Sequence, residues 1–180
     1  MIQGYSICSF CGWSHITWDT NHSFICADCQ KTNFVNLSTA AGVFFYNDAG
    51  EVLIAQRWRE PNKWKYDDPG GFADIGDHSA EGAVIREISE ELGIIIQKSD
   101  LHYLDSEGMN YRYQDRDTPV MVIYFYAYLS RDQINSIITN DDVAAVQWVN
   151  SHTFDPSLMV TIKKAQCVKK VFDIITGTLP

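Results

Sequence analysis

Three glutamates lie close together in the stretch REISEELGI at 86–94. On a helix, Glu87, Glu90 and Glu91 would fall within about 100° of arc, at the border of the apolar face. Like charges at this spacing repel one another, and nearby apolar surface weakens the screening by water. A hard divalent cation such as Mg2+ removes this conflict, because it takes carboxylate oxygens as ligands. The alternative is a solvated acidic face in which Arg86 and Glu90 form a surface ion pair.

Four of the five cysteines form two pairs, Cys8 with Cys11 and Cys26 with Cys29, and fourteen residues separate the pairs. Two thiolates with this spacing bind one side of a tetrahedral zinc ion, and a second such pair completes the shell. The segment between the pairs is typical of a short hairpin with its turn at 19–21. The sequence therefore predicts a small zinc ribbon over residues 1–35, in which a full shell of four cysteines makes the zinc structural.

Two alternatives to a four-cysteine zinc site stay open on the sequence alone. Two disulfides would use the same four residues, but no secretion signal is present and a cytoplasm keeps thiols reduced. His15 and His22 are alternative ligands, and surface positions suit them better because four cysteines already fill the shell.

The composition narrows the classes of partner. Lysine and arginine number 14 against 23 aspartates and glutamates, so the net charge of -9 leaves no broad basic surface for duplex nucleic acid. The longest apolar run, at 120–129, is too short to span a bilayer, and the first ten residues do not form a targeting signal. We therefore expect a cytoplasmic protein that binds neither membrane nor duplex nucleic acid.

After residue 35 the pattern changes to longer elements, which makes 36–180 a second domain. The helix that would hold the glutamates spans 79–92 and buries Val84, Ile88 and Leu92, with Ser79 as its cap and Gly93 as its end. The other predicted elements are a hairpin at 42–58, turns between 93 and 120, strands at 120–129 and 144–149, and a helix from Leu158 to about Thr176.

Together with Gly71 and Gly93, the arginine and glutamates of this helix resemble the Nudix box, G-x5-E-x7-R-E-U-x-E-E-x-G-U, in which U is aliphatic. The resemblance covers about residues 38–175, since EPNKWKYDDPGGFADIGD and DDVAAVQWV are also similar to segments of family members. It implies an α/β fold, the Nudix α/β/α sandwich with a mixed sheet, here preceded by the four-cysteine zinc ribbon. A zinc ribbon before the box also occurs in a subset of the family that includes the NADH pyrophosphatases.

The chain departs from the Nudix box at one place. Gly71 and Arg86 are one residue further apart than in the pattern, so the first box glutamate becomes Asp77 when counted from Gly71 and His78 when counted from Arg86. The loop before the helix is expected to absorb the extra residue. Asp68 stands where relatives often have an apolar residue. We expect it to be a solvated acid in a loop, and the alternative is a role near the metal.

The resemblance implies a hydrolase that cleaves the diphosphate linkage of a nucleoside diphosphate derivative by attack of a metal-activated water on phosphorus. It implies that Glu87, Glu90 and Glu91 bind Mg2+ or Mn2+. Arg86 would orient these glutamates within the catalytic set, and Gly71 would lend its backbone to the substrate site. The general base stays open between Glu90 and three later loop acids, Glu107, Asp141 and Asp142.

The substrate that the resemblance implies is a small nucleotide. Tyr111 and Tyr113, with Trp58 and Trp64, could stack an adenine or nicotinamide ring, and packing in the core or at its rim is the alternative. We expect a dinucleotide-like substrate such as NAD(H) or ADP-ribose. The alternative function is a nucleotide-binding sensor or a zinc-ribbon interaction module with little or no catalysis. A homodimer is compatible with either function.

Overall fold

The computed structural model describes residues 6–19, 22–113 and 116–178, without the side chains of Tyr113 and Arg116. The chain forms two compact units. The first contains Met1–Ser38 and Met109–Val120, and the second contains Thr39–Gly108 and Met121–Pro180. Within the described residues, no helix is both long enough and apolar enough to cross a membrane.

The cysteine-rich part of the first unit is an antiparallel sheet of three strands. These are β1 (Ile16–Trp18), β2 (Ser23–Cys26) and β3 (Thr32–Phe34). Trp18 is opposite Phe24 in the β1–β2 hairpin, and their rings meet edge to face at 5.3 Å. The predicted hairpin is therefore present, while Thr20 and Asn21 of its turn lie outside the described residues.

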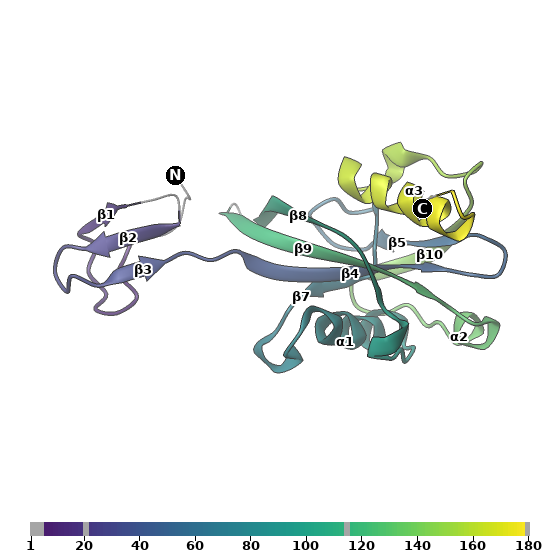
Figure 1. Cartoon of the computed structure of the whole chain (residues 1–180), viewed down its shortest axis with the longest axis horizontal. Helices are drawn as coiled ribbons and strands as arrows, with labels where there is room; N and C mark the ends of the chain where they lie inside the picture. The colour runs from purple at the N-terminus through teal and green to yellow at the C-terminus, as the bar shows by residue number, and fades with distance from the viewer. Residues whose placement is uncertain (1–5, 20–21, 114–115, 179–180) are drawn as a thin grey trace. The chain divides into compact units, whose positions relative to one another are not determined.

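The second unit is built on a seven-stranded sheet in the order β10-β5-β4-β9-β8, with β6 paired to β5 and β7 paired to β4 (Figure 1). The strands are β4 (Ser38–Tyr46), β5 (Val52–Arg57), β6 (Tyr66–Asp67), β7 (Gly70–Phe72), β8 (His102–Tyr113), β9 (Arg116–Tyr128) and β10 (Val143–Val149). The outer ends of β8 and β9 are counted with the first unit.

Strand directions in this sheet are mixed. β4 pairs antiparallel with β5, whereas the ring contacts between β4 and β9 advance in the same direction along both strands, from Phe44 with Tyr124 to Tyr46 with Tyr126. The two strands also end together, since Leu129 N donates a hydrogen bond to Tyr46 O at 2.9 Å. β4 and β9 therefore run parallel.

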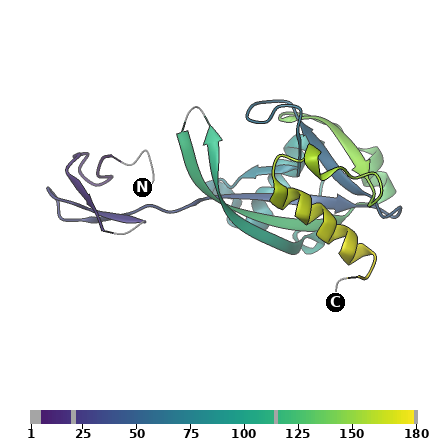
Figure 2. The same cartoon turned by 90° about the horizontal axis from the view of Figure 1, so that it is seen from above.

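Helices cover both faces of the sheet. α1 (Ala80–Leu92) lies on one face and α3 (Ile162–Ile175) lies on the other (Figures 1 and 2). The connecting segments contain α2 (Arg131–Asn135) and three short 3-10 helices, Ile75–Asp77, Lys98–Asp100 and Pro156–Leu158. The expected α/β/α sandwich with a mixed sheet is confirmed.

Apolar side chains stand on both sides of the central strands. Val43 and Phe45 of β4 pack in one core with α1, together with Leu53 of β5. Phe44 is also fully buried, and because successive side chains of a strand alternate in direction, it packs on the opposite face. The sheet therefore buries both of its faces, which is why it needs a helix on each side.

The cap and the end of α1 are those that the sequence predicts, and the helix itself begins one residue later, at Ala80. Ser79 Oγ accepts a hydrogen bond from Gly82 N at 3.1 Å, and Gly93 ends the helix with a φ of 67°. Val84, Ile88 and Leu92 are fully buried, as expected. Their burial fixes the rotation of the helix and with it the direction of each glutamate.

Several predicted elements are wrong in type or extent. β4 and β9 each begin four residues before the predicted position. Residues 102–113, within the expected turns, form β8, because pairing with β9 satisfies the backbone of a segment whose polar sequence gives no strand pattern. The last helix begins at Ile162 rather than at Leu158. Pro156 starts a 3-10 turn instead, and Thr161 caps α3 by accepting a hydrogen bond from Lys164 N.

Candidate functional site

The three glutamates of α1 differ in exposure. Glu91 is only 5% exposed, Glu87 is half-buried and Glu90 is exposed. Glu87 and Glu91 are about one helical turn apart on the same side, whereas Glu90 is rotated toward solvent. Of the three, only Glu91 is among the residues that line the pocket formed with β5, β6 and the start of β10.

Glu91 is held by a backbone amide. Gly70 N donates a hydrogen bond to Glu91 Oε2 at 2.8 Å. Burial raises the pKa of Glu91 to about 8 although this hydrogen bond opposes the rise, and the charges of Glu87 and Asp142 add to it. A divalent cation beside Glu91 would stabilise the ionised form, so this carboxylate has the properties of a metal ligand.

Gly71 leaves no room for a side chain. A Cβ atom at this position would lie 2.5 Å from Glu87 Oε1. Gly71 pairs with Ala41 in the β4–β7 ladder, which fixes its backbone. Burial raises the pKa of Glu87, although Arg86 opposes this rise. The glycine therefore allows a carboxylate of α1 to pack directly on the backbone of β7.

Arg86 connects the glutamates to the loop before α1. Its Nη1 donates hydrogen bonds to Glu87 at 2.9 Å and to Glu90 at 3.0 Å, and its Nη2 donates to Phe72 O at 2.9 Å. Asp77 accepts two more, from Nε at 3.0 Å and from Nη2 at 3.1 Å. The ion pair of Arg86 and Glu90 thus exists, but it is part of a network that orients two of the three glutamates.

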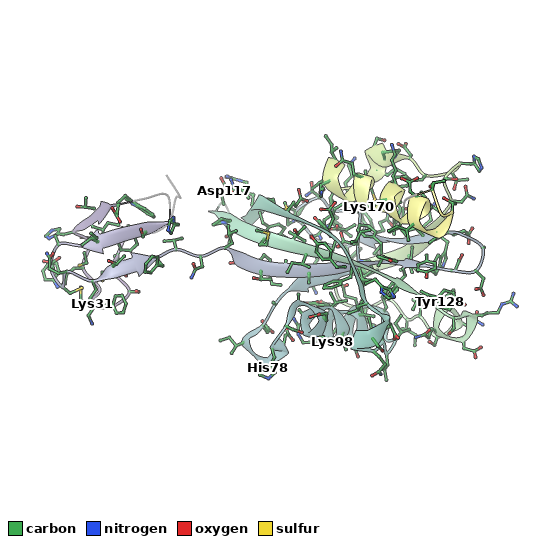
Figure 3. The ribbon with its side chains drawn as sticks, in the orientation of Figure 1. Lys31, His78, Lys98, Asp117, Tyr128 and Lys170 are labelled. Atoms are coloured by element: carbon green, nitrogen blue, oxygen red, sulfur yellow. The ribbon has the colours of Figure 1, made fainter. Side chains whose placement is uncertain are left out.

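The loop before α1 absorbs the inserted residue and shows which residue replaces the first box glutamate. Asp77 is the residue that holds Arg86, and the hydrogen bonds from Arg86 lower the pKa of Asp77. His78 is exposed at the outer end of this loop, with a left-handed φ of 59° (Figure 3). Asp77 therefore occupies the place of the first box glutamate, and His78 is the extra residue relative to the pattern.

His78→Gly should raise the free energy of unfolding by about 0.5 kcal/mol. Glycine relieves a left-handed backbone that costs other residues about 1–2 kcal/mol, and the greater freedom of the unfolded chain offsets part of this gain. Urea denaturation measures the change. The matched control is His152→Gly, at an exposed turn residue without a positive φ, which should lose stability. Equal losses in both variants would contradict strain at His78.

The pocket beside Glu91 is largely polar. Its polar side chains are Gln56, Arg57, Asp67, Asp68, Glu91 and Asp142. Arg59 forms ion pairs with Asp142 at 2.8 Å and with Asp141 at 3.1 Å. Glu107 instead accepts a hydrogen bond from Tyr124 Oη at 2.7 Å. Glu107 is therefore on β8 rather than in a loop, and of the three later acids Asp142 is the one that lines this pocket.

A buried ion cluster that the sequence did not predict joins the pocket to α3. Lys164 forms ion pairs with Asp67 and, at 2.8 Å, with Asp68 Oδ1, and Arg57 Nη1 donates to Asp67 Oδ2 at 3.0 Å. Asp68 is 7% exposed, so the expectation of a solvated loop acid is wrong. Burial raises the pKa of Asp68 to about 7 against the attraction of Lys164. The available signal was the position of Lys164 on the apolar stripe of the last helix, where a lysine needs a buried partner.

The four paired cysteines gather at one point of the first unit. Their Sγ atoms all lie within 4.8 Å of one another, with 3.7 Å between Cys8 and Cys29 and 3.6 Å between Cys11 and Cys26. These distances exclude disulfides, whose sulfurs are about 2.05 Å apart. Four Zn–S bonds of about 2.3 Å in a tetrahedron place the sulfurs about 3.8 Å apart. The cluster therefore has the dimensions of a zinc site.

Neighbouring donors favour the thiolate form of Cys8. Phe10 N donates to its Sγ at 3.4 Å and Asn33 Nδ2 donates at 3.5 Å. Burial opposes ionisation, but these hydrogen bonds lower the pKa of Cys8 to about 6. His15 lies beside Asp28, and His22 stacks near Phe34, so neither histidine joins the cysteine cluster.

The four aromatic residues that are expected to stack on the substrate lie in two separate structural elements. Trp58 and Trp64, in the loop between β5 and β6, meet edge to face with ring centroids 5.5 Å apart. Tyr111 and Tyr113 are on the part of β8 that belongs to the first unit, and the side chain of Tyr113 lies outside the described residues. A role for the two tyrosines in substrate binding stays a prediction.

Comparisons of the sequence and of the structure with known proteins point to one family. A family model described as NUDIX domain matches residues 36–171. The 8-oxo-dGTP diphosphatase of Haemophilus influenzae is 28% identical over 120 residues, which cover 66% of this chain and 79% of that protein.

Solved structures of similar fold include a MutT/nudix family protein from Enterococcus faecalis, at 27% identity and a TM-score of 0.55. That match covers 66% of this chain and 45% of the other, so this chain spans less than half of its length. The NUDIX domain of Shewanella oneidensis NrtR, complexed with ADP ribose, is 20% identical with a TM-score of 0.62, and the match covers 79% of this chain and 90% of that one. With the family match over residues 36–171 and the box residues assembled around Arg86, this chain belongs to the NUDIX domain family.

Proposed function

We propose that this chain hydrolyses the diphosphate linkage of a nucleoside diphosphate derivative and uses Mg2+ or Mn2+ to do so. The observation that carries the proposal is the arrangement of the box side chains. Glu91 is buried beside the Gly70 amide, Glu87 packs on Gly71, and Arg86 donates to Glu87 and Glu90. Carboxylates placed away from water in this way suit cation binding better than solvation.

In this proposal Glu87, Glu90 and Glu91 hold the divalent cation. When bound, the cation supplies charge screening for the diphosphate oxygens and a more acidic water. Arg86 keeps Glu87 and Glu90 oriented, and the backbone of Gly71 borders the substrate. The proton of the attacking water passes to a carboxylate as the P–O bond to the leaving phosphate breaks. Glu90 and Asp142 are the candidates for this base, because Glu90 is exposed and Asp142 lines the pocket.

The proposed substrate class rests on the compounds named for two similar proteins. The name of the Haemophilus influenzae relative refers to 8-oxo-dGTP, and the NrtR domain is complexed with ADP ribose. Both compounds join a nucleoside to a chain of phosphates. We infer the same class for this chain, with a dinucleotide-like compound such as NAD(H) or ADP-ribose as the narrower proposal.

The proposal includes a second metal, a structural zinc bound by Cys8, Cys11, Cys26 and Cys29. A shell of four thiolates has no open position for water or substrate, so this metal takes no part in hydrolysis. Residues 1–35 then form a zinc ribbon before a catalytic domain at 36–180.

The test is a hydrolysis panel with Mg2+ and Mn2+ over ADP-ribose, NADH, diadenosine polyphosphates, nucleoside triphosphates including 8-oxo-dGTP, and sugar nucleotides. We expect at least one compound to be cleaved within its diphosphate when Mg2+ or Mn2+ is present, and no cleavage when both cations are omitted. In 18O-labelled water, mass spectrometry should find the label in a phosphate product, because water attacks phosphorus. Saturable nucleotide binding without hydrolysis of any compound would contradict the proposal and favour a nucleotide sensor.

A further inference from the structure

The loop between β5 and β6 presents two tryptophans to solvent. Trp58 is 48% exposed and Trp64 is 53% exposed, and neither belongs to the hydrophobic core. The ammonium of Lys63 lies over both indoles, 4.4 Å from the ring centroid of Trp58 and 4.9 Å from that of Trp64. Large aromatic side chains that stay exposed together are typical of binding surfaces.

Two backbone hydrogen bonds and one from a side chain hold this loop in one conformation. Arg57 N donates to Lys65 O at 2.9 Å, Trp64 N donates to Arg57 O at 3.0 Å, and Arg57 Nε donates to Pro61 O at 2.9 Å. Trp64 itself has a left-handed φ of 72°, which is an outlier for a bulky aromatic residue. The indole is therefore held outward at the expense of backbone strain, and strain of this kind is concentrated at functional sites.

The same loop is continuous with the wall of the pocket beside Glu91. Gln56 and Arg57, which line that pocket, come directly before Trp58, and Gln56 Nε2 donates to Trp64 O at 3.3 Å. Trp58 N donates to the backbone oxygen of Asp142, another lining residue, at 2.8 Å. A ligand whose phosphates reach the pocket can therefore extend a flat ring toward the two indoles.

The charges of the loop fit a ligand with an aromatic ring at one end and phosphate at the other. Arg59 is already paired with Asp141 and Asp142. Lys63 differs: among the residues that the structure describes, its ammonium contacts ring faces rather than a carboxylate. A ring that stacks on an indole would displace this ammonium, which is then available to a phosphate oxygen. Stacking on tryptophan accepts any nucleobase, because every base has a π face.

We propose that Trp58 and Trp64 form the subsite for the nucleobase of the substrate and that Lys63 moves from the indole faces to a substrate phosphate when the base stacks. This inference rests on the proposed hydrolysis of nucleoside diphosphate derivatives, and it assigns the residues that recognise the nucleoside end.

The equilibrium test uses tryptophan fluorescence of the full-length protein, and it does not require turnover. AMP and GMP should quench the fluorescence, whereas ribose 5-phosphate should not. Trp58→Ala and Trp64→Ala should each weaken AMP binding about tenfold, while Trp58→Phe and Trp64→Phe should retain most of it. Lys63→Met should weaken AMP binding but leave binding of adenosine, which has no phosphate, equal or stronger.

The kinetic test compares the best substrate of the panel in the same variants. The alanine variants should raise KM about tenfold with kcat within about threefold, because stacking positions the substrate without touching the reacting atoms. The matched control is Trp13→Ala, which removes an exposed tryptophan from the first unit and should change neither value. Active enzyme whose KM and AMP affinity are unchanged in all Trp58 and Trp64 variants would overturn the base subsite while leaving the hydrolase function intact. Absence of all hydrolysis with quenching by AMP that depends on both tryptophans would support the subsite and contradict the hydrolase function.

Discussion

Glu91→Gln should lower kcat/KM at least about a hundredfold on the best nucleotide substrate. The substitution keeps the shape of the side chain and an oxygen that can accept the hydrogen bond from Gly70 N, but it removes the negative charge. Loss of a charge that binds a catalytic cation costs on the order of 3 kcal/mol of transition-state stabilisation. Steady-state kinetics over a range of Mg2+ concentrations measures the loss and any shift in metal affinity.

The same substitution should stabilise the metal-free protein. Glu91 has a pKa of about 8 in the fold, above the value of about 4.3 for an unfolded chain. The folded state therefore binds this proton more tightly than the unfolded state. The stability that the protonated Glu91 contributes is fully present below about pH 4.3 and is lost as the pH rises to 8. Glu91→Gln should raise the free energy of unfolding at pH 8 by about 2 kcal/mol or more and flatten its pH dependence.

Glu81→Gln is the matched control for Glu91, because Glu81 is on the same helix, at a variable position of the box, and pairs with Lys98 at 3.5 Å. It should leave activity and the pH dependence of stability nearly unchanged. Urea denaturation without added Mg2+ or Mn2+, from pH 5 to 8, compares the variants. Near-normal activity in Glu91→Gln, or a metal-free stability that falls rather than rises at pH 8, would contradict a cation site at Glu91.

Removal of the zinc should unfold the three-stranded sheet of the first unit. In the described part of this segment few apolar side chains are fully buried, chiefly Phe24 and two of the cysteines, so its own core is too small to hold the fold. Structural zinc sites supply about 10–16 kcal/mol of apparent binding free energy. Cys26→Ser should reduce zinc from one ion per chain to well below one and expose residues 6–37 to protease.

Cys167→Ser serves as the control for this experiment, since Cys167 is buried on α3 and lies outside the cluster. It should keep one zinc per chain. Elemental analysis gives the metal content, and limited proteolysis with mass spectrometry locates the cleavage sites. Wild-type protein purified without chelator that contains no zinc would refute the prediction, and so would a Cys26→Ser variant that keeps both zinc and protease resistance.

Local sequence was sufficient for the elements whose signals lie within one helical turn or one hairpin. The cap at Ser79, the stop at Gly93 and the four-residue spacing of Val84, Ile88 and Leu92 define α1 because helix hydrogen bonds and side-chain neighbours are local. The cysteine pairs define their cluster for the same reason. The sequence did not reveal β8, because a polar strand is specified by the partner strand with which it pairs.

By itself, the sequence determined the family, the glutamate-bearing helix and the cysteine set, because residue types at short spacings carry that information. Only the tertiary structure decided which groups meet across long separations. Asp77 rather than His78 holds Arg86, and Glu91 is buried while Glu90 is exposed. Lys164 reaches Asp67 from 97 residues away, since α3 packs on the face of the sheet opposite α1. Burial and ion pairing between distant residues depend on how the layers stack, and no local pattern encodes that arrangement.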